Sequence, residues 1–120
     1  AREMLMAPAP PTAFLISSMI TAIGVRRAVE DLGMKLGREV SVVIHDDELS
    51  YLRNGEDIPI FSATRSSVRS AGQLCADMLL DIIRQPGQPP RQRLLEAELT
   101  VGLSTAPAPK IETARRAERR

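Results

Sequence analysis

Two short apolar runs enclose an amphipathic segment in the first third of the chain. The first run is residues 13–16 (Ala-Phe-Leu-Ile), and the second is residues 40–44 (Val-Ser-Val-Val-Ile), which is rich in β-branched side chains. Runs of this length are typical of strands, and strands that are apolar almost throughout are typical of a parallel sheet buried on both faces. We therefore expect two buried parallel strands here.

The segment between the two runs has the period of an amphipathic helix. Ser17 and Ser18 are good N-cap residues, and Gly33 is placed to end the helix after about Leu32. Gly24 is better explained by close helix packing than by phosphate binding. The face expected to lie on the sheet consists of Thr21, Ala22, Val25, Ala28, Val29 and Leu32.

Three apolar residues of the same helix, Met19, Ile20 and Ile23, do not belong to that face. They share the other side with charged residues, namely Arg26, Arg27, Glu30 and Asp31. An apolar patch rimmed by charge indicates a partner surface. A helix that is covered by more of its own chain would show the same pattern, so the pattern alone leaves both explanations open.

The rest of the chain predicts a second helix between further strands. Residues 59–64 read as a strand, and apolar residues recur at spacings of three and four over residues 67–85, before Pro86 and Gly87. Residues 94–101 supply one or two edge strands. The order strand, helix, strand, strand, helix, strand predicts an α/β fold with a mostly parallel sheet flanked by helices.

The two ends of the chain differ from its middle. Residues 1–6 read as the last turns of a helix that begins upstream, and the prolines that follow exclude regular structure. We therefore divide the chain into residues 1–11, a helix end with a Pro-rich linker; residues 12–106, one lobe; and residues 107–120, a flexible basic tail.

Composition limits the function that this lobe can have. The chain of 120 residues is 43% hydrophobic and 26% charged, as expected of one globular domain. A net charge of +1 does not build a DNA-binding face, and 2% aromatic content leaves almost no stacking platform. The single Cys75 falls on the apolar stripe of the second helix, which predicts a reduced core thiol in a cytoplasmic protein. The sequence shows neither a signal peptide nor an apolar run of membrane length, so no membrane partner is expected.

The densest group of ionisable side chains comes directly after the second strand: His45, Asp46, Asp47 and Glu48. Ligands of parallel sheets bind beyond the carboxyl ends of the strands, so Ser18 and Asp46 mark the place for chemistry or binding. Recognition of a ligand hydroxyl or amine by the Asp46 carboxylate is one explanation. Capping of the next helical turn by Asp46 or Asp47 is the other, and spacing alone does not separate the two.

Other kinds of site find no support in the sequence. A metal site would need a further ligand near His45, and the chain has no second His. A phosphoacceptor site would need another Asp after a later strand and a Lys beyond, but residues 61–65 contain no Asp and no Lys follows until Lys110. Hydrolase and nucleotide-binding motifs are missing. No catalytic residue, metal or cofactor is therefore predicted, and the protein is not expected to be an enzyme.

The order of several segments resembles one family of regulators. Residues 11–28 (PTAFLISSMITAIGVRRA), 31–34 (DLGM) and 40–47 (VSVVIHDD) are similar to the carboxyl-terminal effector-binding subdomain of lactose-repressor and galactose-repressor type (LacI/GalR) transcriptional regulators. The likeness continues through the strand at residues 61–65, the helix with Gly72 and the closing Ser-Thr-Ala-Pro. It implies about one lobe of a periplasmic-binding-protein-like (type I) fold.

The resemblance also implies a function. In such regulators a small effector, often a sugar or nucleobase, binds between two lobes and shifts the equilibrium between DNA-competent and incompetent arrangements. The helix-turn-helix and first lobe of the family are missing from this chain, so DNA would be bound only through them. The alternative is a periplasmic-type sugar or solute-binding protein that feeds a transporter.

Site residues follow from the resemblance position by position. Asp46 matches a strand-end Asp that commonly contacts effector, Ser18 stands where the family usually has Asn, and Ser66 replaces a frequent Gln. Met19 replaces an Asp and His45 replaces an aromatic residue. The changed pocket-side positions disfavour an ordinary hexose as the effector.

The resemblance further implies a homodimer. Members of the family dimerise through the helix that begins at Ser18, which agrees with the second apolar face of this segment. The residues expected at the interface are Ile20, Ile23, Arg27, Tyr51 and Leu52.

Overall fold

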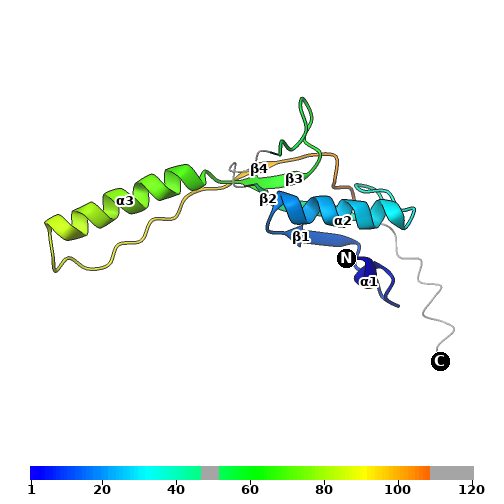
Figure 1. Cartoon of the computed structure of the whole chain (residues 1–120), viewed down its shortest axis with the longest axis horizontal. Helices are drawn as coiled ribbons and strands as arrows, with labels where there is room; N and C mark the ends of the chain where they lie inside the picture. The colour runs from blue at the N-terminus through cyan, green and yellow to red at the C-terminus, as the bar shows by residue number, and fades with distance from the viewer. Residues whose placement is uncertain (47–51, 109–120) are drawn as a thin grey trace.

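A computed structural model describes residues 1–46 and 52–108 of the chain. In these residues three helices and four strands follow in the order α1 (Arg2–Leu5), β1 (Ala13–Ile16), α2 (Met19–Asp31), β2 (Ser41–Asp46), β3 (Ser62–Arg65), α3 (Val68–Arg84) and β4 (Glu98–Thr100). The strands form one sheet in the order β1-β2-β3-β4, with β4 antiparallel to β3 and the other pairs parallel (Figure 1). The predicted α/β class with a mostly parallel sheet is confirmed.

The register of the parallel strands aligns their carboxyl ends. Ile16 of β1 lies opposite Ile44 of β2, and Asp46 at the end of β2 lies opposite Arg65 at the end of β3. The residues that follow these three strands therefore share one edge of the sheet, which we call the carboxyl edge.

The core lies between the sheet and α2. Ala22 and Val29 of α2 and Val42 and Ile44 of β2 are fully buried, which is the burial that holds an amphipathic helix on a sheet. Ser18 caps α2, since its hydroxyl accepts a hydrogen bond from the Thr21 N–H at 3.4 Å. The predicted start and end of this helix are confirmed.

The buried face of α2 is turned slightly from the predicted one. Met19 was expected on the outer side, but only 5% of it is exposed, whereas Thr21, expected on the sheet, is exposed. Side chains in the first turn of a helix lean toward its N-terminus, so the long Met19 side chain reaches the core beside the end of β1. The prediction for these two residues was wrong.

The opposite face of the sheet is open in the described part of the chain. Leu15, which points away from α2, is 85% exposed, while its neighbour Ile16 is 7% exposed. The strands were expected to be buried on both faces. That expectation was wrong, because the only helix packed on the described sheet is α2.

α3 has the predicted amphipathic pattern but not the predicted packing. Ser67 caps it by accepting from the Ser70 N–H at 3.1 Å, yet α3 packs on none of the other described elements and points away from the sheet (Figure 1). Its apolar residues Leu79 and Ile83 are 57% and 66% exposed, and Cys75 is exposed too. The prediction of a buried thiol at Cys75 was therefore wrong, because the face that carries it meets no partner in the described chain.

The segments near the ends complete the sheet. β4 is shorter than the strand predicted over residues 94–101, and β3 begins later than predicted because residues 59–61 precede it as a loop. Beyond β4, the fully buried Ser104 hydroxyl accepts from the Ser62 N–H at 2.9 Å and donates to the Val42 carbonyl. These bonds attach the segment after β4 to β2 and β3. α1, predicted as a helix end, packs on α2. The tail from residue 109 lies outside the described residues.

Candidate functional site

The three residues predicted to bind effector all lie at the carboxyl edge. Ser18 follows β1, Asp46 ends β2 and Ser66 follows β3. The backbone joins two of them, because the Ser66 N–H donates to the Asp46 carbonyl at 3.4 Å. The order of the sheet thus brings together positions that are up to 48 residues apart in the sequence, as the predicted parallel topology requires.

Asp46 is a nearly buried carboxylate beside a hollow. Its side chain is 13% exposed, and its Oδ2 lies 3.9 Å from the Nε of Arg65, which is 43% exposed. Both side chains line a hollow of about 330 Å³, together with the loop that carries Arg53, Asn54 and Glu56. A separation of 3.9 Å is longer than the 2.7–2.9 Å typical of a charge-assisted hydrogen bond. This contact with Arg65 is therefore longer than a direct hydrogen bond, and a carboxylate has lone pairs for more than one donor.

Asn54 gives this hollow a rigid wall. Its side-chain amide donates to the Phe61 carbonyl at 2.7 Å and accepts from the Phe61 N–H at 2.8 Å, as a strand partner would. Phe61 is itself 2% exposed, so the loop is fixed to the core at this point. The core therefore fixes the wall that Asn54 contributes to the hollow beside Asp46.

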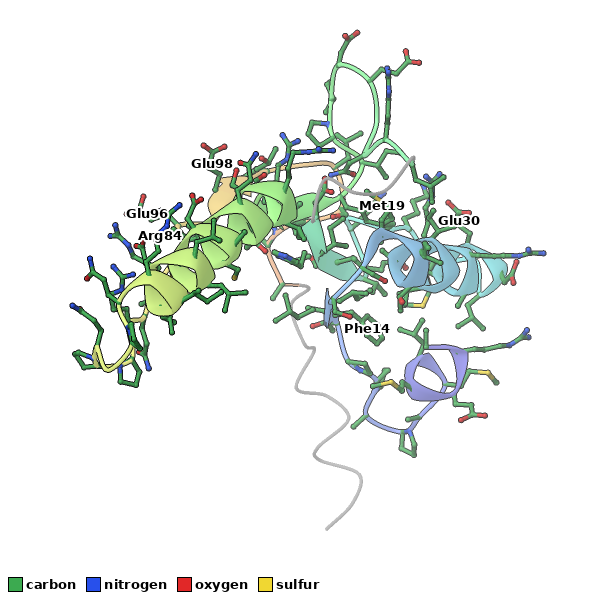
Figure 2. All side chains as sticks on the ribbon, turned by 60° about the vertical axis from the view of Figure 1, so that its left-hand side comes forward. Phe14, Met19, Glu30, Arg84, Glu96 and Glu98 are labelled. Atoms are coloured by element: carbon green, nitrogen blue, oxygen red, sulfur yellow. The ribbon has the colours of Figure 1, made fainter. Side chains whose placement is uncertain are left out.

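Ser66 lies on the other side of Arg65. It lines a second hollow of about 310 Å³ between the start of α3 and the segment that returns to β4, with Ser70 and Glu96. Glu96 lies on this returning segment and Glu98 begins β4 (Figure 2). Because side chains alternate along a strand, Ser66 and Asp46 leave opposite faces of the sheet, and Arg65 lines both hollows.

Ser18 is bonded through its hydroxyl to α2 and to neither Asp46 nor Ser66 in the described residues. Its hydroxyl lies 3.0 Å from the Thr21 hydroxyl, in addition to its capping bond. No hydrogen bond in residues 1–46 and 52–108 joins it to Asp46 or Ser66. The structure thus places Ser18 at the predicted edge and assigns its hydroxyl to the helix cap.

A network that the sequence did not reveal joins β2 to Ser66. The ring of His45 lies 3.1 Å from the Thr64 hydroxyl through Nδ1 and 3.2 Å from the Ser66 hydroxyl through Nε2. Thr64 and Arg65 were not among the predicted site residues. The parallel register, with His45 opposite Thr64 and Asp46 opposite Arg65, is the signal that would have identified both.

Three of the five predicted dimer residues lie together on the outer side of α2. Ile20 is 72% exposed and Ile23 is 44% exposed, and Arg27 is exposed one turn further on. Gly24 lies on the same stripe, and a Cβ added to it would meet nothing within 4 Å. Close packing within the described chain therefore does not explain Gly24. Leu52 is 46% exposed, whereas Tyr51 lies outside the described residues.

The described residues contain neither a cluster of metal ligands nor a membrane-spanning helix. No three His, Cys, Asp or Glu side chains there lie close enough to hold a metal ion, although Asp47 and Glu48 fall outside that range. No helix in the same residues is long and apolar enough to span a membrane.

The chain matches a known protein family and is similar to several proteins that are named as regulators or repressors. A family described as a periplasmic binding protein-like domain matches residues 1–105. The HTH-type transcriptional regulator AglR of Rhizobium meliloti (strain 1021) is 42% identical over 108 residues, which cover 90% of this chain and 30% of that protein. The lactose operon repressor of Escherichia coli (strain K12) is 31% identical over 116 residues, covering 93% and 30%.

A third relative agrees with these two. It is the uncharacterized HTH-type transcriptional regulator YvdE of Bacillus subtilis (strain 168), which is 32% identical over 109 residues, covering 88% of this chain and 32% of that protein. The chain thus spans about 30% of the length of the curated relatives that it matches.

Proposed function

The chain belongs to the periplasmic binding protein-like domain family, among regulators of the lactose-repressor type, and from this premise we propose that it senses a small effector for a transcriptional regulator. All three relatives are named as regulators or repressors of transcription. Those names favour a regulator over a solute-binding protein that feeds a transporter. Binding, without catalysis, is the proposed activity.

The observation that supports this proposal best is the position of Asp46. A carboxylate that is 13% exposed, at the end of a parallel strand and beside a hollow, is where an α/β sheet binds polar ligands. A hydroxyl or amine of the effector would donate to Asp46 alongside the Arg65 guanidinium, because a carboxylate accepts from more than one donor. Ser66 would add a second polar contact from the neighbouring hollow, on the other side of Arg65, and Ser18 would hold α2 in place at the same edge of the sheet.

The proposed pocket is half of a site between two lobes. α3 supports this view, because a 17-residue amphipathic helix with its apolar face exposed lacks the burial that normally stabilises such a helix. A second body that packs against α3 would lie beyond the carboxyl edge, on the side toward which α3 points (Figure 1). An effector bound at Asp46 would then touch both bodies.

Allosteric control would follow from that arrangement. An effector that bridges two lobes binds their closed arrangement more tightly than the open one, so it shifts the population toward closure by that difference in affinity. A DNA-binding part outside this chain would respond to the arrangement of the lobes. This lobe would touch no DNA itself, in keeping with its net charge of +1.

A homodimer through α2 completes the proposal. An exposed Gly inside a helix costs about 1 kcal/mol relative to Ala, so its presence calls for a compensating use. Close approach of a second α2 over Gly24, with Ile20 and Ile23 packed on either side, would supply that use. A two-fold axis through this stripe would let each residue meet the same patch of the partner.

Effector-dependent DNA binding tests the function. The full-length regulator, with DNA from upstream of its own gene, is titrated with a panel of sugars, polyols, amino sugars and nucleobases while the anisotropy of the labelled DNA is read. We expect at least one compound to change the affinity for DNA, and the Asp46→Ala variant to keep its DNA binding and to need about tenfold or more of the compound for the same response. An unchanged midpoint of the response in Asp46→Ala would contradict the proposal.

A further inference from the structure

His45 is hydrogen-bonded through both ring nitrogens, and neither partner is charged. Nδ1 lies 3.1 Å from the Thr64 hydroxyl, and Nε2 lies 3.2 Å from the Ser66 hydroxyl. The ring and Thr64 leave the face of the sheet opposite α2, where the register places them side by side. The proposed function uses Ser66 as a contact for the effector but gives no task to His45 or Thr64.

The direction of these hydrogen bonds follows from a third one, between the Thr64 hydroxyl and the Ile44 carbonyl. The Thr64 hydroxyl also lies 3.5 Å from the Ile44 carbonyl, a long contact to a group that can only accept, so Thr64 is placed to donate its single hydroxyl hydrogen there. In that arrangement Thr64 accepts from His45, which puts the ring proton on Nδ1. A neutral imidazole has one donor and one acceptor, so Nε2 accepts the hydroxyl hydrogen of Ser66.

The opposite tautomer makes fewer hydrogen bonds. With the proton on Nε2, the ring would donate to Ser66 and Thr64 would donate to Nδ1. Thr64 would then have no hydrogen for Ile44, so two of the three hydrogen bonds would remain. A hydrogen bond of ordinary length contributes about 1 kcal/mol and the 3.5 Å contact with Ile44 contributes less, so the tautomer with three hydrogen bonds is favoured by a fraction of that energy.

We propose that His45 is a positioning residue that fixes the Ser66 hydroxyl as a hydrogen-bond acceptor toward the pocket. The hydrogen of Ser66 is bound to Nε2, and what remains for a ligand is the oxygen with its lone pairs. This inference rests on the proposed function, since Ser66 matters only as part of an effector site. The group of the effector that meets the Ser66 oxygen is therefore a donor, a hydroxyl or an amine N–H.

The arrangement also places one acceptor on each side of Arg65, which lines both hollows. The Asp46 carboxylate can only accept, and a Ser66 whose hydrogen is held by His45 behaves in the same way. Two acceptors at neighbouring strand ends, one in each hollow, suit a compound whose donors reach both sides of Arg65, such as a polyol or an amino sugar. A free serine, which donates as readily as it accepts, would not make that distinction.

The tautomer of His45 can be read directly. His45 is the only histidine of the 120 residues, so the ¹⁵N NMR signals of a histidine ring need no further assignment. For the neutral ring, at mildly alkaline pH, we expect a protonated Nδ1 and an unprotonated Nε2. A spectrum with the proton on Nε2, or with equal populations of the two tautomers, would overturn the proposal.

Two variants of Thr64 provide the matched comparison. Thr64→Val removes the acceptor for Nδ1–H, so the preference for that tautomer is expected to disappear, whereas Thr64→Ser keeps the hydroxyl and should keep it. An unchanged tautomer in Thr64→Val would show that Thr64 does not set the direction, and the proposal would fail. Because no effector is added, such a failure is distinct from failure of the proposed function, which the DNA titration detects by itself.

Discussion

Replacing Gly24 by alanine should have opposite effects on the folded lobe and on its self-association. Gly24 is the sixth residue of the 13-residue α2, its position is exposed, and an added Cβ meets nothing within 4 Å. Alanine is favoured over glycine inside helices by about 0.5–1 kcal/mol, so we expect the free energy of unfolding of the monomer to rise by that amount.

The same methyl group should weaken the dimer. At a two-fold contact it enters twice, once from each subunit, at the point where we expect the two helices to be closest. Overpacking of a close contact costs about 1–3 kcal/mol, which corresponds to weakening of the dimer by roughly fivefold to 150-fold. The packing of Ile20 and Ile23 against the partner would be lost with it.

Two measurements separate these effects. Urea unfolding at a concentration where the protein is monomeric gives the stability of the lobe, and sedimentation velocity over a concentration series gives the dimer dissociation constant. Gly72→Ala is the matched control, because Gly72 lies inside exposed α3 and also has no neighbour within 4 Å of its would-be Cβ. It should leave association unchanged. If Gly24→Ala also leaves the dimer unchanged, close approach of two helices at Gly24 is refuted.

Three further substitutions test other parts of the structure. Ile23→Glu should abolish the dimer, because it places a charge in the apolar stripe of both subunits, and unchanged sedimentation where the parent is dimeric would contradict this. Ser104→Ala should lower the free energy of unfolding by about 1–3 kcal/mol, since the buried Ser62 N–H loses its acceptor. An unchanged free energy in urea unfolding would show that the hydrogen bond between Ser104 and Ser62 does not stabilise the fold. Gly37→Ala should destabilise by about 1 kcal/mol or more, since its φ is +73° and a Cβ would lie 1.9 Å from the Leu103 carbonyl oxygen; equal urea midpoints would refute this.

Features set by neighbouring residues were predictable from the sequence. The boundaries of β1 and α2 follow from an apolar run, an N-cap serine and Gly33 within about 20 residues, and the structure confirms them. The α/β class follows from the order of such segments. Each of these signals acts through local backbone preference or local periodicity, which one sequence displays directly.

Features set by distant partners were not predictable in the same way. The pattern of α3 shows that it has an apolar face but not what covers that face, and the exposed Cys75 and Leu15 were misjudged for this reason. The link from His45 to Thr64 and the ion pair of Asp46 with Arg65 depend on the register of two strands. Hydrophobic patterns alone do not fix that register for residues at the end of a strand.

The candidate site lies between these cases. Parallel topology was enough to place Asp46 and Ser66 at one edge, where the structure has them, joined by a backbone hydrogen bond of 3.4 Å. It was not enough to show that their side chains face different hollows with Arg65 between them. Their roles toward an effector, and the dimer role of the residues on α2, stay predictions.

Calorimetry on the full-length regulator tests the central claim, that Asp46 binds the effector, most directly. The compound that changes DNA affinity is titrated into the parent protein, into Asp46→Ala, and into Asp31→Ala, which removes an exposed carboxylate at the far end of α2. A hydrogen bond to a charged group contributes about 1.5–3 kcal/mol, so Asp46→Ala should weaken binding by about tenfold or more and Asp31→Ala should not weaken it. Equal dissociation constants for the parent and Asp46→Ala would contradict the claim.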